Sequence, residues 1–197
     1  MINTQYETRE AWLEALVDKL RPSFAELGKP LPDRIRISVG FPRGSRGKSA
    51  AIGQCWSGAA ADDGVNQIFI SPTLTDPARV CGVATHECSH SAAGIEQGHK
   101  KAFKLIAEGM GLTGKMTATT ETPEFEAWAR RVVRDLGPYP HAGLNESAGR
   151  KKQTTRLIKA ECNDCWAIIR LTRRVIESPG LPPCACGGKF AEAEAGA

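Results

Sequence analysis

The 197-residue sequence has no run of apolar residues long enough to cross a membrane as a helix, and it has no internal repeat. Its first seven residues are polar and lack the basic-then-apolar order of a secretion signal. We therefore expect a cytoplasmic protein without a membrane-spanning segment. Histidine occurs only four times and aromatic residues make up only 6% of the chain, so any clustering of histidines is informative.

Seven cysteines is an odd number, and four of them stand in two close pairs. In a reducing compartment such pairs bind a metal more often than they form disulfides. Cys162-x-x-Cys165 and Cys184-x-Cys186 are separated by eighteen residues, and thiolates on two such turns can complete a tetrahedron around zinc. They predict a structural zinc ribbon over residues 150–190, with a reduced, metal-free hairpin as the alternative. The other cysteines, expected to be small buried hydrophobes, are Cys55, Cys81 and Cys88.

His86, Glu87 and His90 form an H-E-x-x-H pattern inside a helix that we predict over residues 76–92. Histidines four residues apart lie one turn apart on the same helix face, so both imidazoles can reach one zinc ion. The carboxylate of Glu87 lies beside that face, where it can take a proton from a water that zinc has acidified. The pattern predicts a catalytic zinc site with Glu87 as the general base. Three unrelated helix residues are the alternative.

A third ligand must come from outside this helix. His99 is the best candidate, because it follows Gly98 and a turn there can fold it back over the metal. Glu96 is the second choice, and it occupies the position at which a longer H-E-x-x-H-x-x-G-x-x-H pattern would have its third histidine. Glu108 is less favoured, because nine residues along a helix place it on roughly the opposite side from His99.

The H-E-x-x-H residues followed by the segment Gly98–Phe103 resemble SprT-like zinc metallopeptidases, the family that includes Spartan. In that family a Gly-His-x-x-x-Phe segment supplies the third zinc ligand, which would be His99 here. The resemblance spans about residues 10–190, although the gap between His90 and His99 is shorter than in Spartan. The order of further segments is also similar, and these are Gly53–Trp56, Ile68–Ser71 and the cysteine-paired ribbon.

Together these patterns predict an α+β fold, with a small antiparallel-type sheet, a zincin active-site helix, flanking helices and a zinc ribbon. We expect a peptidase domain over residues 1–149, the ribbon over 150–190 and a disordered tail over 191–197. We expect helices over residues 8–27, 76–92 and 99–108 and over a stretch that begins at Pro123. Strands are expected over residues 34–39, 51–56 and 67–71. Residues 137–149 are expected to form a linker.

The predicted activity is hydrolysis of peptide bonds by a zinc metallopeptidase with one catalytic and one structural Zn²⁺. The resemblance implies that its substrates are proteins associated with DNA. An alternative is a nucleic-acid-binding zinc protein whose H-E-x-x-H site is structural or degenerate. A zinc hydrolase that acts on something other than peptides is a third interpretation.

Charge is unevenly distributed along the chain, and this bears on DNA binding. The formal net charge is +4, but residues 127–190 contain 12 basic and five acidic side chains. This C-terminal half predicts a face that binds DNA phosphates, with an ordinary solvated surface as the alternative. We expect Trp166, Ile168 and Ile169 to pack between the ribbon strands, and base stacking by Trp166 is less favoured. The candidate phosphate contacts are Arg150, Lys151, Lys152, Arg170, Arg173 and Arg174.

Two other features carry less weight. The segment 44–49 is similar to a phosphate-binding loop, but the first required glycine is replaced by Pro42, so we reject nucleotide binding. Tyr139 and His141 follow the last predicted helix of the first domain. A plain linker role is favoured for them over polarisation of a substrate carbonyl.

Overall fold

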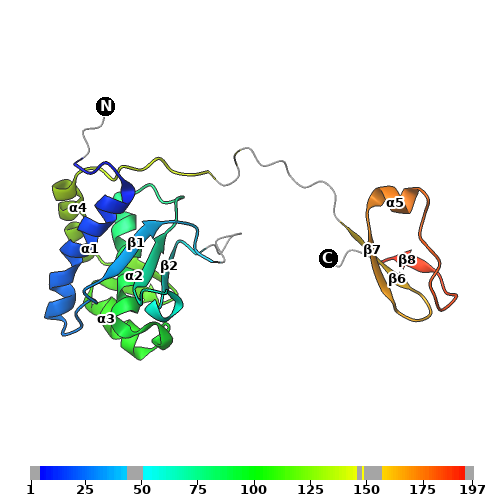
Figure 1. Cartoon of the computed structure of the whole chain (residues 1–197), viewed down its shortest axis with the longest axis horizontal. Coiled ribbons are helices and arrows are strands. Elements are labelled where there is room, and N and C mark those ends of the chain that lie inside the picture. Colours follow the sequence, from blue (N-terminus) through cyan, green and yellow to red (C-terminus); the bar gives the residue numbers. More distant parts are fainter. Residues whose placement is uncertain (1–4, 44–50, 146–147, 149–156, 194–197) are drawn as a thin grey trace. The chain divides into compact units, whose positions relative to one another are not determined.

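The computed structural model describes residues 5–43, 51–145, 148 and 157–193. The chain divides into two compact units, residues 1–146 and 147–197, and Figure 1 labels their helices and several of their strands. No helix within the described residues is both long and apolar enough to span a membrane. The glycine-rich segment 44–49 and the basic residues 150–152 lie outside the described part of the chain.

The first helix, α1 (Arg9–Glu26), begins where the side chain of Thr8 accepts a hydrogen bond from the backbone N–H of Ala11 at 3.1 Å. Its apolar side chains recur every three or four residues and form one continuous buried stripe. Gly28, at a φ of 67°, follows the last turn, and the helix predicted over residues 8–27 is confirmed. The buried residues are Trp12, Leu13, Leu16, Val17, Leu20 and Phe24.

Three short strands, β1 (Ile35–Val39), β2 (Gly53–Trp56) and β3 (Asn66–Ile70), form a sheet in the order β1-β3-β2. A single 3-10 turn, η1 (Gly58–Ala60), lies between β2 and β3. The α+β class is confirmed, but the sheet is mixed, because β1 pairs parallel with β3 while β2 pairs antiparallel with it. Strand β2 lies between β1 and β3 in the sequence. In the sheet it pairs with the edge of β3 that faces away from β1. Among the described residues it is therefore an edge strand, and one side of its backbone has no strand partner there.

The motif-bearing helix, α2 (Pro77–Ala93), is close to its predicted bounds. The carboxylate of Asp76 accepts a hydrogen bond from the backbone N–H of Ala78 at 3.1 Å, and Pro77 occupies the first helical position. At the other end, Gly94 stops the helix with a φ of 87°.

Helix α3 (Lys101–Gly109) follows a short 3-10 turn, η2 (Ile95–Gln97). The helix begins two residues later than predicted, because Gly98 turns the chain at a φ of 51° and leaves His99 in the turn. His99 is therefore placed by a turn rather than by a helix.

A hairpin that the sequence did not predict follows α3. Strand β4 (Leu112–Lys115) pairs antiparallel with β5 (Ala118–Glu121), and Gly114 has a φ of 85°, which favours glycine. Helix α4 (Pro123–Leu136) comes next, at the predicted start. The hairpin matters for function because it forms part of the candidate site.

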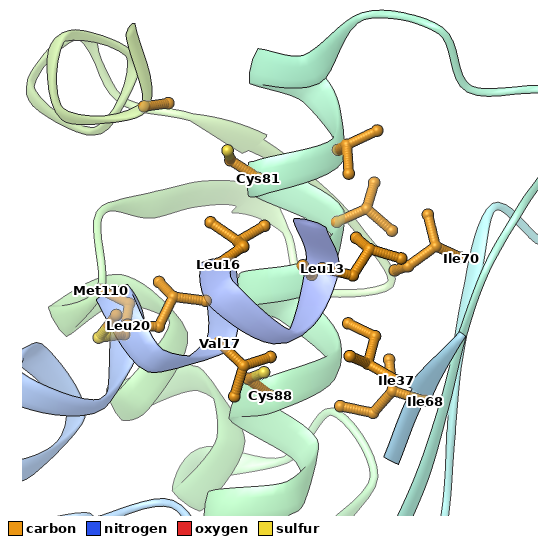
Figure 2. Packing of buried hydrophobic residues seen from close by; sticks show 14 of the residues in the cluster. Leu13, Leu16, Val17, Leu20, Ile37, Ile68, Ile70, Cys81, Cys88 and Met110 are labelled. Carbon is orange, nitrogen blue, oxygen red and sulfur yellow. The ribbon is translucent and has the colours of Figure 1, made fainter. Parts of the chain in front are cut away.

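The core of the first unit lies among α1, α2 and the sheet, and Figure 2 shows labelled side chains from all three gathered there. Cys81 and Cys88 of α2 are fully buried in this core, and Cys55 of β2 packs against it. Burial raises the pKa values of Cys55 and Cys81 to about 12, so both thiols stay protonated and uncharged. The prediction that these cysteines are small buried hydrophobes is confirmed for Cys81 and Cys88, whereas Cys55 is only partly buried.

Residues after α4 pack on the first unit, although residues 137–149 were predicted to be a linker. The indole Nε1–H of Trp12 donates a hydrogen bond to the carbonyl of Gly137 at 3.0 Å. Tyr139 is only 8% exposed, and its ring centroid lies 5.0 Å from that of Trp12. The backbone N–H of Leu144 donates to the loop after β3. The proline and glycine content of this segment predicted a linker, but the contact between Tyr139 and Trp12 holds it against the first unit.

The second unit is a small antiparallel sheet in the order β7-β6-β8. Ala191 and Glu192 pair with β6, so the prediction of a disordered tail is wrong at these two positions, and residues 194–197 lie outside the described part of the chain. The elements are β6 (Ile158–Cys162), β7 (Ile168–Leu171), α5 (Arg173–Glu177) and β8 (Phe190–Glu192).

Trp166 and Ile168 are 75% and 54% exposed, so the prediction that they pack between the strands is wrong. Trp166 follows the first cysteine pair with a φ of 62°, in the left-handed region. Along β7 exposure alternates, so Ile168 and Arg170 face outward while Ile169 is half-buried. The ribbon therefore presents an exposed aromatic, an exposed aliphatic and a basic side chain on neighbouring positions.

Candidate metal centre and active site

Three histidine side chains converge at one point of the first unit. His86 and His90 lie one turn apart on α2, and His99 reaches them from the turn at Gly98. The Nε2 atom of His99 lies 3.3 Å from that of His86 and 3.2 Å from that of His90. The structure thus brings together the two motif histidines and the predicted third ligand.

These distances fit a four-coordinate metal ion. Zinc–nitrogen bonds of 2.0–2.1 Å in a tetrahedron require nitrogen atoms about 3.3 Å apart. The three histidines form a group that can hold a metal ion. The alternatives, Glu96 and Glu108, do not belong to it; Glu96 is exposed, and Glu108 forms an ion pair with Lys104.

The ring of Phe103, on α3, packs against all three imidazoles. It is fully buried, and its centroid lies 4.9 Å from that of His86, 4.2 Å from His90 and 5.0 Å from His99. The His90 ring stacks on it at an interplanar angle of 26°. Apolar packing therefore restricts the histidine rotamers before any metal binds.

The three imidazoles are held in their neutral form. Burial is the main cause that lowers the pKa of His86 to about 3 and that of His90 to about 4, and the neighbouring histidines add to both shifts. Burial also lowers the pKa of His99. Neutral imidazole is the form that coordinates metals, so none of these residues has to lose a proton at neutral pH before binding one.

Glu87 is 6% exposed and its carboxylate lies against β2. A Cβ atom on Gly53 would lie 2.5 Å from Oε1 of Glu87 and 2.6 Å from Cγ1 of Val83, so only glycine allows this close approach. Burial raises the pKa of Glu87 to about 8, and a backbone hydrogen bond from Cys55 opposes the rise. Glu87 is placed beside the histidines and is not one of the three converging groups.

A cavity of about 690 Å³ is lined by the three histidines and Glu87. One wall consists of the edge strand β2 with the two residues before it, and another consists of the β4–β5 hairpin. An open cavity beside a metal-binding group is the arrangement expected of a catalytic site, since a purely structural site is closed by protein ligands. Further polar residues that line it are Gln54, Arg79, Lys115, Thr117 and Thr119.

Sequence reasoning missed Thr119 and Gly53 as residues of the site. Thr119 Oγ1 lies 2.9 Å from Nδ1 of His86, on the side of the ring away from the other histidines. The available signal was the run of β-branched threonines around Gly114, which favours a hairpin. For Gly53 no local signal exists, because the need for glycine arises from the packing of α2 on β2.

Tyr139 and His141 do not belong to the site. Among the residues described around the cavity, neither contributes to its lining. His141 is instead held by Arg9, whose Nη1 lies 3.2 Å from its Nδ1, and by the carbonyl of Pro72, 2.8 Å from its Nε2. Both residues attach the segment after α4 to the body of the unit, which differs from the plain linker role that the sequence favoured.

The four paired cysteines of the second unit also converge, and they form a second group that can hold a metal ion. Sγ–Sγ distances are 3.5 Å for Cys162 and Cys186 and for Cys165 and Cys184. These distances are far from the ~2.05 Å of a disulfide and near the ~3.8 Å of a zinc tetrathiolate. Backbone hydrogen bonds from Cys165 and Asp164 lower the pKa of Cys162 to about 7, which favours the thiolate ligand.

Comparisons with protein-family models, curated proteins and solved structures return no match. The resemblance to SprT-like peptidases therefore rests on the motif residues alone. The chemistry has to be argued from the arrangement of the histidines, Glu87 and the cavity.

The two clusters predict two metal ions per chain. Elemental analysis of the intact protein after loading with zinc should give a value close to two, and His99→Ala should remove about one of them, because two histidines alone hold zinc weakly. Glu96→Ala is the matched control and should leave the metal content unchanged. Loss of metal in the Glu96 variant with retention in the His99 variant would contradict the assignment of the third ligand.

Proposed function

We propose that this protein is a zinc-dependent peptidase. The observation that carries the proposal is the combination of three converging Nε2 atoms and a buried carboxylate from the same helix in one open cavity. A structural metal site has no need of a carboxylate beside its ligands, and it leaves no room for a substrate. Zinc is the ion proposed because imidazole ligands in a tetrahedral set suit it well.

The chain's own residues have separate tasks in this reaction. Zinc held by His86, His90 and His99 would supply Lewis acidity and would lower the pKa of a bound water to about 7. The positive charge of bound zinc would lower the raised pKa of Glu87, and the ionised carboxylate would accept a proton from the attacking water and deliver it to the leaving amine. Because Glu87 is almost fully buried, bulk water does not compete for that proton.

The edge strand β2 supports a peptide as the substrate class. Gly53, Gln54 and Cys55 line the cavity, and in the part of the chain that the structure describes β2 pairs with β3 alone. An extended peptide can add to such an edge by main-chain hydrogen bonds, which are independent of side-chain identity. This mode brings a scissile carbonyl past Glu87, which packs against Gly53 on the same strand.

Glu87→Gln tests the role of this carboxylate. The change keeps the size and polarity of the side chain and removes only its ability to accept a proton. We expect zinc content and unfolding temperature to match the parent, while hydrolysis of an unfolded protein such as casein falls by a factor of about 10² to 10⁴. Glu96→Gln, an exposed carboxylate nearby, is the matched control and should retain activity.

Activity within about tenfold of the parent in the Glu87 variant would rule out this carboxylate as the base. A parent protein that is loaded with zinc yet inactive on peptides would favour the alternative of a nucleic-acid-binding protein with a degenerate site.

The second part of the proposed function is binding to DNA, which would direct the peptidase to proteins on DNA. Support comes from the ribbon, where Trp166 is 75% exposed and Ile168 and Arg170 of β7 also face outward. Exposed aromatics stack on unpaired bases, and arginine pairs with phosphate. Tethering a peptidase to DNA raises the effective concentration of bound proteins at its active site.

The charges of the ribbon itself refine this proposal. Its described residues, 157–193, carry five basic and four acidic side chains, and Arg173 is engaged by Glu192 at 2.8 Å. Most of the positive excess therefore comes from residues 150–156, which contain four basic and no acidic side chains, whereas α4 contains three of each. Phosphate binding is expected to depend on residues 150–152, and base stacking on Trp166.

Titration of the full-length protein with DNA at several salt concentrations separates these two contributions. Changing Arg150, Lys151 and Lys152 together to alanine should lower the slope of log K against log salt on duplex DNA by about 2 to 3. Trp166→Ala should weaken binding to single strands by about 1–3 kcal/mol and leave duplex binding unchanged. Leu157→Ala, at a 57% exposed position in the same unit, is the control. An intact protein with no affinity for DNA at low salt would remove this part of the function.

A further inference from the structure

The β4–β5 hairpin is attached to α2 beside the metal-binding histidines by a set of polar contacts. Arg79 and His86 are seven residues apart on α2, so they lie on nearly the same side of the helix. Thr119 and Glu121 are two residues apart on β5, so they share one face of the hairpin. These two surfaces meet, and each contact between them joins a residue of α2 to one of β5.

Two of these contacts hold the hairpin in place. The guanidinium Nη1 of Arg79 donates to Oε1 of Glu121 at 2.5 Å and to the backbone carbonyl of Thr119 at 3.4 Å. Glu121 lies so close to α2 that a Cβ atom on Gly82 would collide with its carboxylate. The ion pair is partly shielded, because the side chain of Glu121 is only 15% exposed. The position of β5 relative to α2 is therefore fixed at residues 119 and 121.

The third contact joins the hairpin to a metal-binding side chain. Thr119 is 5% exposed, and its Oγ1 lies 2.9 Å from Nδ1 of His86. Since Nε2 of His86 faces the other two histidines, the proton of the neutral imidazole must be on Nδ1 when Nε2 binds a metal. Nδ1–H then donates to the threonine oxygen, which selects this tautomer and fixes the ring orientation.

Among the residues that the structure describes, the other two histidines have no equivalent partner. Within the described residues, no protein group forms a hydrogen bond with Nδ1 of His90 or of His99. Their rings are oriented by contact with Phe103, which is apolar and cannot select a tautomer. Polar control of the metal-binding group is thus concentrated at His86.

We propose that Thr119 is a positioning residue of the metal site: its hydroxyl holds His86 in the tautomer and orientation that bind zinc. This inference rests on the proposed function, because it assumes that the histidines bind a metal. It extends that function by making the hairpin, rather than α2 alone, a determinant of metal affinity. Outer partners of metal-bound histidines typically change metal affinity by a factor of about 10 to 100.

The test compares three variants of the full-length protein. Thr119→Val keeps the branched shape and removes the hydroxyl, Thr119→Ser keeps the hydroxyl, and Thr120→Val makes the same chemical change at the neighbouring exposed position of β5. Zinc affinity is measured by competition with a colorimetric chelator, with the four-cysteine site as an internal reference. Thermal unfolding of the metal-free proteins is followed in parallel.

We expect Thr119→Val to weaken zinc binding at the histidine site by about 10- to 100-fold, with Thr119→Ser and Thr120→Val within about threefold of the parent. The metal-free unfolding temperatures should be similar for all four proteins. If Thr119→Val does not fold, Thr119→Ala takes its place with the same expected loss. Zinc affinity of the Val or Ala variant within threefold of the parent, or a Ser variant as weak as either, would overturn the proposal.

Failure of the proposed function gives a different result. A parent protein that binds zinc only at the four-cysteine site contradicts metal binding by the histidines, and with it the role of Thr119. A parent that binds zinc at both sites, together with an unaffected Thr119→Val variant, contradicts the positioning role alone.

Discussion

Burial of one side of α2 is the constraint on which the site depends. Cys81 and Cys88 point into the core, and at about 100° per residue they lie on the opposite side of the helix from His86 and His90. Packing of the cysteine side against α1 therefore turns both histidines toward the cavity. Glu87 lies between these two sides of the helix, and its side chain points toward β2. One amphipathic helix thus sets the directions of two ligands and the base at once.

The surroundings of that helix complete the chemistry. Burial keeps the imidazoles neutral and ready to coordinate a metal, and it isolates the Glu87 carboxylate from bulk water. These effects need close packing around the site. Gly53 allows β2 to approach Glu87 closely, and Phe103 packs against the histidine rings. Placing polar groups in such surroundings costs stability, so their convergence on one cavity is better explained by function than by folding.

The sequence allowed prediction of features that depend on local periodicity. The apolar stripe of α1 and the four-residue spacing of His86 and His90 each lie within one helix, and both predictions are confirmed. Features set by distant contacts were missed. The β4–β5 strands are four residues each and have a weak pattern, and the hairpin is stabilised by the Arg79 and Glu121 pair, whose partners are 42 residues apart. The exposure of Trp166 depends on a left-handed backbone conformation that spacing of the cysteines does not encode.

The central claim is that His86, His90 and His99 together bind one zinc ion over the cavity that contains Glu87. The most direct test is an anomalous difference map at the zinc absorption edge from crystals of the zinc-loaded protein. The account predicts a peak about 2.0–2.1 Å from Nε2 of all three histidines, in addition to one among the four cysteines. A peak among the cysteines alone, or a histidine peak that lacks His99, would contradict it.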